Sequence, residues 1–139
     1  MNRLLLVLLL TAAPALHAQS PAQSDDGARA PASRLTVFFD CRAWCDYDYI
    51  REQVSFVDWV RERSAADVHL LVTSQGAGAG GDQYILAFIG QRGEAGRADT
   101  LRFTTAPTTT SDERRDLVAR HVAAGLVPYI ARTGNAALL

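Results

Sequence analysis

Four short segments rich in β-branched and aromatic residues constrain the fold of this chain most strongly. They lie at residues 35–39, 68–73, 84–90 and 100–104. Because such residues fit a pleated surface, each segment is predicted to be a β-strand. The last segment alternates apolar with polar residues, which predicts a more exposed strand at a sheet edge.

An amphipathic segment between the first two strands is predicted to be a helix. Asp46 or Asp48 can cap its start, and apolar residues then recur at three- and four-residue spacing as far as Val60. Arg61 and Arg63 would lie in the last turn, where positive charge is favourable. Helical structure is therefore expected as far as this pair of arginines.

A second helix is predicted after the last strand. It begins at a capping box, Thr110-Ser111-Asp112-Glu113, and its apolar face extends to Ile130. Pro128 cannot donate to the carbonyl of Ala124, so a kink is expected there. Gly134 suits a left-handed helix cap.

The predicted element order, β-α-β-β-β-α, indicates an α+β domain built as a two-layer α/β sandwich. A right-handed crossover makes the first two strands parallel, and hairpins make the others antiparallel, which gives a four-stranded mixed sheet. Both helices are expected on one face of this sheet. Strand 100–104 or strand 35–39 could then accept a partner strand along its edge.

The N-terminus, residues 1–18, has the pattern of a secretory signal peptide. Arg3 precedes a leucine-rich core, and small residues lead to Ala18, where cleavage is expected, with Ala15 as the other candidate. The apolar run is shorter than the roughly 20 residues of a membrane-spanning helix. A buried N-terminal helix is the alternative. We expect an exported protein, located in the periplasm or at the outer membrane.

The remaining chain is predicted to contain one folded unit and no transmembrane helix. Residues 19–34 are expected to be a flexible leader, residues 35–134 a single α/β domain, and residues 135–139 a C-terminal tail. All 14 basic residues are arginine, set against 15 acidic residues. The lack of lysine excludes lysine nucleophiles and a P-loop, and the near-neutral balance gives no support for nucleic-acid binding. The oligomeric state stays open.

Cys41 and Cys45 follow a predicted strand and precede a predicted helix, as redox cysteines do in thioredoxin-like proteins. Three residues separate them, where the thioredoxin-like motif has two, and no cis-proline loop is evident. A structural disulfide is the leading prediction for an exported protein. Two free thiols, or a redox or metal function, are the alternatives.

A glycine-rich segment connects the second and third predicted strands. It contains Gly76, Gly78, Gly80 and Gly81 in the spacing Gly-x-Gly-x-x-Gly. A dinucleotide site needs this motif to open a helix, but a strand follows here. The segment is predicted to be a flexible hairpin loop that could lie against a partner. A small-ligand site is a weaker alternative, because no charged anchor is fixed nearby.

No catalytic group of residues emerges from the sequence. His69 and His121 have no cysteine or carboxylate at ligand spacing, so each is predicted to be a packed or edge histidine rather than a ligand, and His17 belongs to the signal peptide. No serine lies in a nucleophile-elbow context. We therefore expect no cofactor, no metal and no enzymatic activity.

The chain resembles an uncharacterised bacterial cell-envelope family over most of residues 35–133. The residues that carry the resemblance are Phe39-Asp40-Cys41, Cys45-Asp46, Ile50-Arg51, Phe56-Val57, Val60-Arg61-Glu62-Arg63, residues 66–73, the glycine-rich segment, Tyr84, Phe88-Ile89-Gly90 and residues 125–130. In that family the exported domain precedes a long region that resembles an outer-membrane β-barrel. The resemblance implies either that a barrel region is missing after Leu139 or that this chain is a stand-alone version.

The element order, with a glycine-bearing hairpin and a terminal arginine-rich helix, is also similar to the N-terminal domain of the TolB family. This likeness implies protein–protein interaction in the periplasm. The leading prediction is a non-catalytic interaction domain of the cell envelope, with an envelope protein as partner. The second prediction is a thiol–disulfide oxidoreductase that uses Cys41 and Cys45.

Overall fold

The computed structural model describes residues 33–133. The predicted signal peptide, most of the predicted leader, Gly134 and the predicted tail lie outside these residues. The elements are β1 (Thr36–Cys41), α1 (Tyr47–Gln53), β2 (Asp58–Val60), β3 (Val68–Gly76), β4 (Asp82–Gly90), β5 (Ala98–Thr104) and α2 (Ser111–Ile130), with short 3-10 helices at Arg63–Ala65 and Arg92–Glu94. No helix in this part of the chain has the length and apolar character needed to cross a bilayer.

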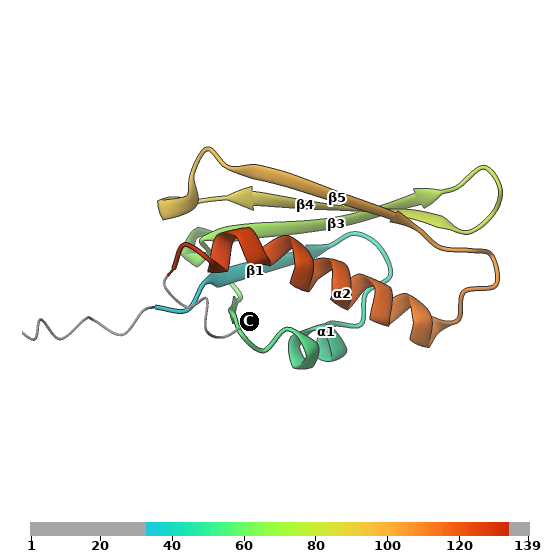
Figure 1. The fold of residues 1–139 in the computed structure, drawn as a ribbon, viewed down its shortest axis with the longest axis horizontal. Coiled ribbons are helices and arrows are strands. Elements are labelled where there is room, and N and C mark those ends of the chain that lie inside the picture. Colours follow the sequence, from blue (N-terminus) through green and yellow to red (C-terminus); the bar gives the residue numbers. More distant parts are fainter. Residues whose placement is uncertain (1–32, 134–139) are drawn as a thin grey trace, which may run out of the picture.

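The strands form one mixed sheet in the order β2-β1-β3-β4-β5. β1 pairs in parallel with both β2 and β3, whereas β3, β4 and β5 form an antiparallel series. Both helices lie on the same side of the sheet (Figure 1). The predicted α+β class is confirmed, but the predicted four strands are wrong, because the sheet has five.

The additional strand, β2, lies in the segment that was predicted to be helical. Helix α1 ends at Gln53, and Val54 forms its C-cap. Trp59 then pairs with Val37 of β1, and Val60 pairs with Phe38. The β-branched and aromatic residues of this segment favour a strand. The edge of β1 supplies the backbone hydrogen-bond partners, which the periodicity of the sequence cannot reveal.

Because residues 58–60 form a strand, two further predictions are wrong. Arg61 and Arg63 do not lie in the last turn of a helix, because Arg63 begins a 3-10 turn instead. β1 is an interior strand, so the prediction that strand 35–39 could accept a partner is wrong. Within residues 33–133 the edge strands of the sheet are β2 and β5, and the edge position predicted for strand 100–104 is confirmed.

The two faces of the sheet differ in burial. Side chains that point toward the helices are buried, namely Val37, Phe39, Val68, Leu70, Val72, Tyr84, Leu86 and Phe88. The opposite face carries half-buried apolar residues, namely Phe38, Leu71, Ile85, Ala87 and Ile89. The strict alternation along each strand assigns every side chain to one face.

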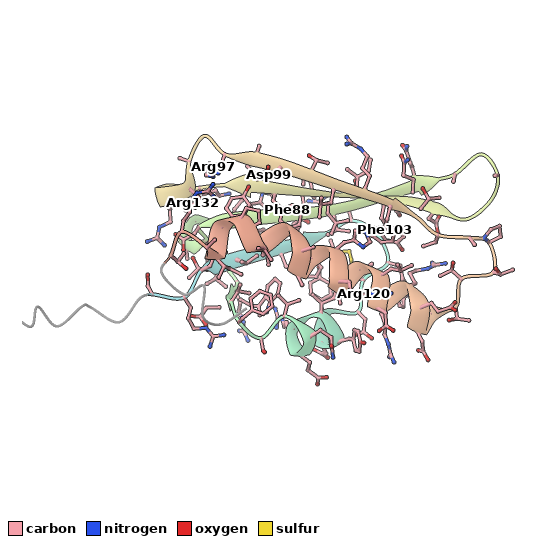
Figure 2. The ribbon with its side chains drawn as sticks, viewed as in Figure 1. Phe88, Arg97, Asp99, Phe103, Arg120 and Arg132 are labelled. Carbon is pink, nitrogen blue, oxygen red and sulfur yellow. A yellow bond between two sulfur atoms is a disulfide. The ribbon has the colours of Figure 1, made fainter. Side chains whose placement is uncertain are left out.

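Helix α2 packs closely on β4. Its start is fixed by the predicted capping box, in which Thr110 accepts from the Glu113 amide and the Glu113 carboxylate accepts from the Thr110 amide. Near its end the buried Tyr129 hydroxyl donates to the Phe88 carbonyl at 3.1 Å. Figure 2 shows Phe88 between the sheet and this helix. Pro128 lies inside the helix, which continues to Ile130.

Candidate interaction surface at the disulfide loop

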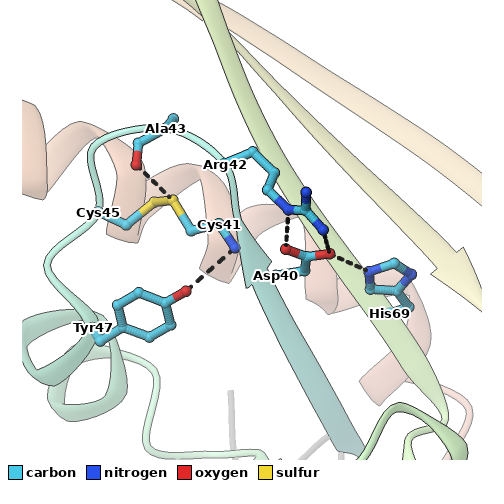
Figure 3. A network of polar contacts seen from close by, with 7 residues as sticks. All are labelled: Asp40, Cys41, Arg42, Ala43, Cys45, Tyr47 and His69. Atoms are coloured by element: carbon cyan, nitrogen blue, oxygen red, sulfur yellow. Dashed lines mark hydrogen bonds and ion pairs between the residues drawn. A yellow bond between two sulfur atoms is a disulfide. The ribbon is translucent and has the colours of Figure 1, made fainter.

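The segment 41–47, called here the disulfide loop, connects β1 to α1. Cys41 and Cys45 are joined by a disulfide, with 6.4 Å between their Cα atoms. The Cys41 amide donates to the Tyr47 hydroxyl at 3.4 Å (Figure 3). The Arg42 amide donates to the Val72 carbonyl at 2.7 Å. The loop is thus attached at both of its ends to the sheet and to α1.

Asp46 closes the loop by capping α1. Its carboxylate accepts a hydrogen bond from the Tyr49 amide at 3.1 Å. This is the capping role that the sequence predicted for Asp46 or Asp48. The disulfide and the cap together define where the helix starts and in which direction the loop leaves it.

Two large aromatic side chains of the disulfide loop face solvent. Trp44 is 43% exposed and Tyr47 is 42% exposed, and the only other exposed large apolar side chain in residues 33–133 is Val127, at 41%. Arg42, in the same loop, has 70% of its side chain exposed. Tryptophan, tyrosine and arginine are the residue types that dominate binding energy at protein interfaces.

The exposed tryptophan is held in place by contacts on its inner side. Its backbone carbonyl accepts a hydrogen bond from the buried Tyr84 at 3.4 Å. The Arg114 guanidinium lies 5.8 Å from the centre of the Trp44 ring and 3.6 Å from the Asp82 carboxylate. Trp44 is therefore positioned by β4 and α2 as well as by the disulfide ring that encloses it.

The next residue of α2 anchors the start of α1. The Arg115 guanidinium lies 4.6 Å from the centre of the Tyr49 ring and 3.9 Å from the Asp46 carboxylate. The Tyr49 hydroxyl also donates to the carboxylate of Asp116. The first two turns of α2 thus support both the disulfide loop and the helix that follows it.

The glycine-rich segment forms the β3–β4 hairpin at the same end of the domain. The Gly80 amide donates to the Ala77 carbonyl at 2.9 Å, and Gly80 and Gly81 have positive φ angles of 87° and 79°. A Cβ at Gly81 would lie 2.0 Å from the Thr105 carbonyl oxygen. Gly80 and Gly81 form a tight turn against residues 105–107, which follow β5, while Gly76 and Gly78 have open space around them. Asp82 follows the turn, and its carboxylate lies 3.6 Å from the Arg114 guanidinium.

A cluster of polar side chains lies next to the disulfide loop, on the face of the sheet opposite the helices (Figure 3). We call this the uncovered face. The Asp40 carboxylate accepts a hydrogen bond from the Arg42 guanidinium at 2.8 Å and lies 3.6 Å from Nε2 of His69. The hydrogen bond from Arg42 holds the pKa of Asp40 below its usual value. His69 is only 4% exposed, and its ring lies 5.4 Å from that of Phe38. The prediction of a packed histidine at position 69 is confirmed.

Burial of His69 gives the stability of the domain a pH dependence. Burial, with a further contribution from the positive charge of Arg63, lowers the pKa of His69, and the neighbouring Asp40 only partly opposes this. An unfolded histidine titrates at about 6.5, so the unfolded chain binds more protons than the folded chain just below that pH. The free energy of unfolding should therefore decrease as the pH falls below about 6.5.

Urea unfolding at pH 7, 6 and 5 measures this effect. We expect the decrease to be smaller in His69→Leu, because that side chain does not titrate. His121→Gln controls for loss of a histidine elsewhere. An equal pH dependence in wild type and His69→Leu would contradict the assignment.

The disulfide is expected to stabilise the fold modestly. By the loop-closure relation, a ring of five residues contributes about 2 kcal/mol. Replacing both Cys41 and Cys45 with serine should lower the free energy of unfolding by about that amount, which urea denaturation can measure against wild type with and without reductant. An unchanged urea midpoint in the double variant would show that the disulfide does not support the loop.

The described residues contain no group of three histidine, cysteine or acidic side chains that could hold a metal ion. A groove of about 400 Å³ lies between α1 and α2 and is lined by Tyr49, Gln53, Asp116, Ala119, Arg120 and Ala123. Tyr49 and Asp116 are already hydrogen-bonded to one another there. The groove therefore offers few free polar groups for a small ligand.

The sequence prediction named both cysteines but missed Trp44, Tyr47 and Arg114. The available signal was a tryptophan enclosed between two closely spaced cysteines, since such a ring displays its residues at the surface. The role of Arg114 depends on how α2 docks, which sequence spacing does not reveal. Comparison of the chain with family models, with curated proteins and with solved structures found no match.

Proposed function

We propose that this chain is a non-catalytic interaction domain of the bacterial cell envelope that binds a protein partner through the disulfide loop. The observation that carries the proposal is the exposed Trp44, which sits in a disulfide ring and is supported from behind by Arg114 and Tyr84. Tryptophan is among the residue types that most often contribute large binding energies at protein interfaces.

The geometry favours binding because the loop is ordered before any partner arrives. Immobilising a flexible loop on binding costs free energy, and a loop already held by a disulfide and a helix cap avoids much of that cost. Trp44 and Tyr47 offer apolar area, and Arg42, whose guanidinium is hydrogen-bonded to Asp40, adds an exposed positive charge to the loop. These are the features of a compact, preorganised contact surface.

The envelope location rests on the predicted signal peptide and on the chemistry of the cysteines. Disulfides persist in oxidising compartments such as the periplasm and are rare in the cytosol. The resemblance of the sequence to an exported envelope family and to the TolB N-terminal domain also supports an envelope location. A partner in the periplasm or at the outer membrane is therefore part of the proposal.

The proposal can be tested by affinity capture with the full chain. Tagged wild-type protein, Trp44→Ala and Val127→Ala would each be produced in a bacterium that exports it, and captured proteins identified by mass spectrometry. Val127 is the matched control because its exposed fraction, 41%, is close to that of Trp44. We expect one envelope protein to be enriched with wild type and Val127→Ala and lost with Trp44→Ala. No reproducible enrichment, or equal recovery with all three, would overturn the proposal.

A thiol–disulfide oxidoreductase is the second candidate, and the disulfide between a strand and the start of α1 is the observation that favours it. That function predicts reduction of insulin by the dithiol form and its loss in Cys41→Ser. The interaction function predicts no insulin reduction by either protein. The insulin assay thus separates the two functions without knowledge of a partner.

A further inference from the structure

We propose that two copies of this chain associate through β5, whose antiparallel pairing would join two five-stranded sheets into one continuous sheet. This surface is separate from the disulfide loop, so the proposal does not depend on the proposed function. It rests on the free backbone groups of β5 and on the register that its sequence allows.

β5 is the longer of the two free edges. It has seven residues, whereas β2, at the other edge, has three. β5 pairs with β4 along its whole length without a bulge. It contains no proline, and its two charged residues, Asp99 and Arg102, leave Thr100 and Leu101 between them uncharged. A strand of this length can therefore act as a template for another strand.

The hydrogen-bond pattern shows which backbone groups of β5 face outward. The Gly90 amide donates to the Arg97 carbonyl at 2.8 Å, and the Thr105 amide donates to the Asp82 carbonyl at 2.9 Å. In an antiparallel pair the bonded residues alternate. The backbone N–H and C=O groups that point away from β4 therefore belong to alternate residues, namely Ala98, Thr100, Arg102 and Thr104.

The sequence of β5 favours one register with a second copy. A two-fold axis at Leu101 overlaps all seven residues and places Thr100 opposite Arg102 of the second copy. An axis at Arg102 would place two arginines directly opposite each other, which is unfavourable. An axis at Thr100 would overlap only five of the seven strand residues. The Leu101 register therefore combines the most hydrogen bonds with no opposed like charges.

In this register the side chains of β5 would also fit against those of β5 in a second copy. The two Leu101 side chains would meet on the helix side of the sheet, beside Phe103, which stacks on Tyr84 and His121 at 4.9 and 4.2 Å (Figure 2). On the uncovered side, Thr100 would face Arg102 of the second copy, so no two like charges are directly opposed. The contact would thus join the two Leu101 side chains to the existing apolar layer, with Arg102 next to the two-fold axis on the other side of the sheet.

Cysteine crosslinking of the full chain tests the register. In the proposed dimer the Leu101 positions form a non-hydrogen-bonded pair with Cα atoms about 4.5 Å apart, a distance that a disulfide can bridge. The two Thr100 positions would be diagonal neighbours about 7 Å or more apart. We expect Leu101→Cys to form a covalent dimer under mild oxidation and Thr100→Cys to do so far more slowly. Equal crosslinking of both variants, or of neither, would overturn the proposal.

Thr100→Pro tests the dimer without any added thiol. Proline at this position removes an outward N–H and leaves the hydrogen bonds between β4 and β5 intact. Sedimentation should show a concentration-dependent dimer for wild type and a dimer dissociation constant about 30-fold higher for Thr100→Pro, since two hydrogen bonds are lost per dimer. Circular dichroism reports whether the variant is folded. A wild-type protein that stays monomeric over the crosslinking concentrations would contradict the proposal.

Discussion

Replacing Gly125 with valine is expected to disturb the packing of α2 on the sheet and to destabilise the domain by about 3 kcal/mol. A Cβ atom at this position would lie 2.0 Å from Cζ of Phe88, far inside van der Waals contact. The Phe88 ring is fully buried, and the Tyr129 hydroxyl holds α2 to the Phe88 backbone, so neither side can easily move away. A loss of this size is a large part of the stability of an ordinary domain.

The measurement is urea unfolding followed by circular dichroism. Gly125→Ala should show a smaller loss, because alanine favours a helix over glycine by about 1 kcal/mol and so offsets part of the clash. Gly93→Ala is the matched control, since a Cβ there would have no atom within 4 Å. If the clash is direct, Phe88→Leu should partly rescue Gly125→Ala. An unchanged urea midpoint in Gly125→Val would contradict the packing of α2 on β4.

Replacing Trp44 with alanine is expected to weaken binding of the captured partner by about 30-fold or more, the effect of losing about 2 kcal/mol at an interface hot spot. The same change should affect folding little, because nearly half of the side chain is exposed and the main buried contact, from Tyr84, is made to the Trp44 backbone. The variant therefore separates a role in binding from a role in the fold.

Calorimetric titration of the purified chain with the captured partner measures the Trp44 effect. Trp44→Phe should retain part of the affinity, since an aromatic ring remains, and Val127→Ala should bind like wild type. Urea unfolding of each variant reports on folding. Unchanged affinity in Trp44→Ala would place the contact surface elsewhere on the domain.

The strands and α2 were predictable because their signals are local. Strands 35–39, 68–73, 84–90 and 100–104 all appear within a few residues of their predicted bounds, since β-branched and aromatic residues favour a pleated surface. The capping box fixed the start of α2 for the same reason, because a cap depends on side chains three residues apart.

The region of β2 could not be predicted, because its structure depends on a distant partner. Val57 and Val60 satisfy helical spacing equally well, and only the open edge of β1 selects a strand for this segment. Helix α1 therefore ends several residues earlier than periodicity indicates. Short edge strands of three residues leave too little sequence pattern to outweigh an overlapping helical one.

The candidate site was predicted only in part for a similar reason. The cysteine pair is visible in the sequence, but its surroundings come from separate elements: Tyr84 from β4 and Arg114 from α2. The closeness of His69 to Asp40 depends on the parallel pairing of β1 with β3. Contacts of this kind follow from topology and are not encoded in local spacing.

Site-specific photocrosslinking in cells is the sharpest test of whether the disulfide loop binds a partner. A benzophenone amino acid would replace Trp44 in one variant of the full chain and Val127 in another, since both side chains are similarly exposed. We expect a discrete crosslink to one envelope protein from position 44 and none from position 127. No crosslink from position 44, or the same adducts from both positions, would contradict the claim that the disulfide loop binds a partner.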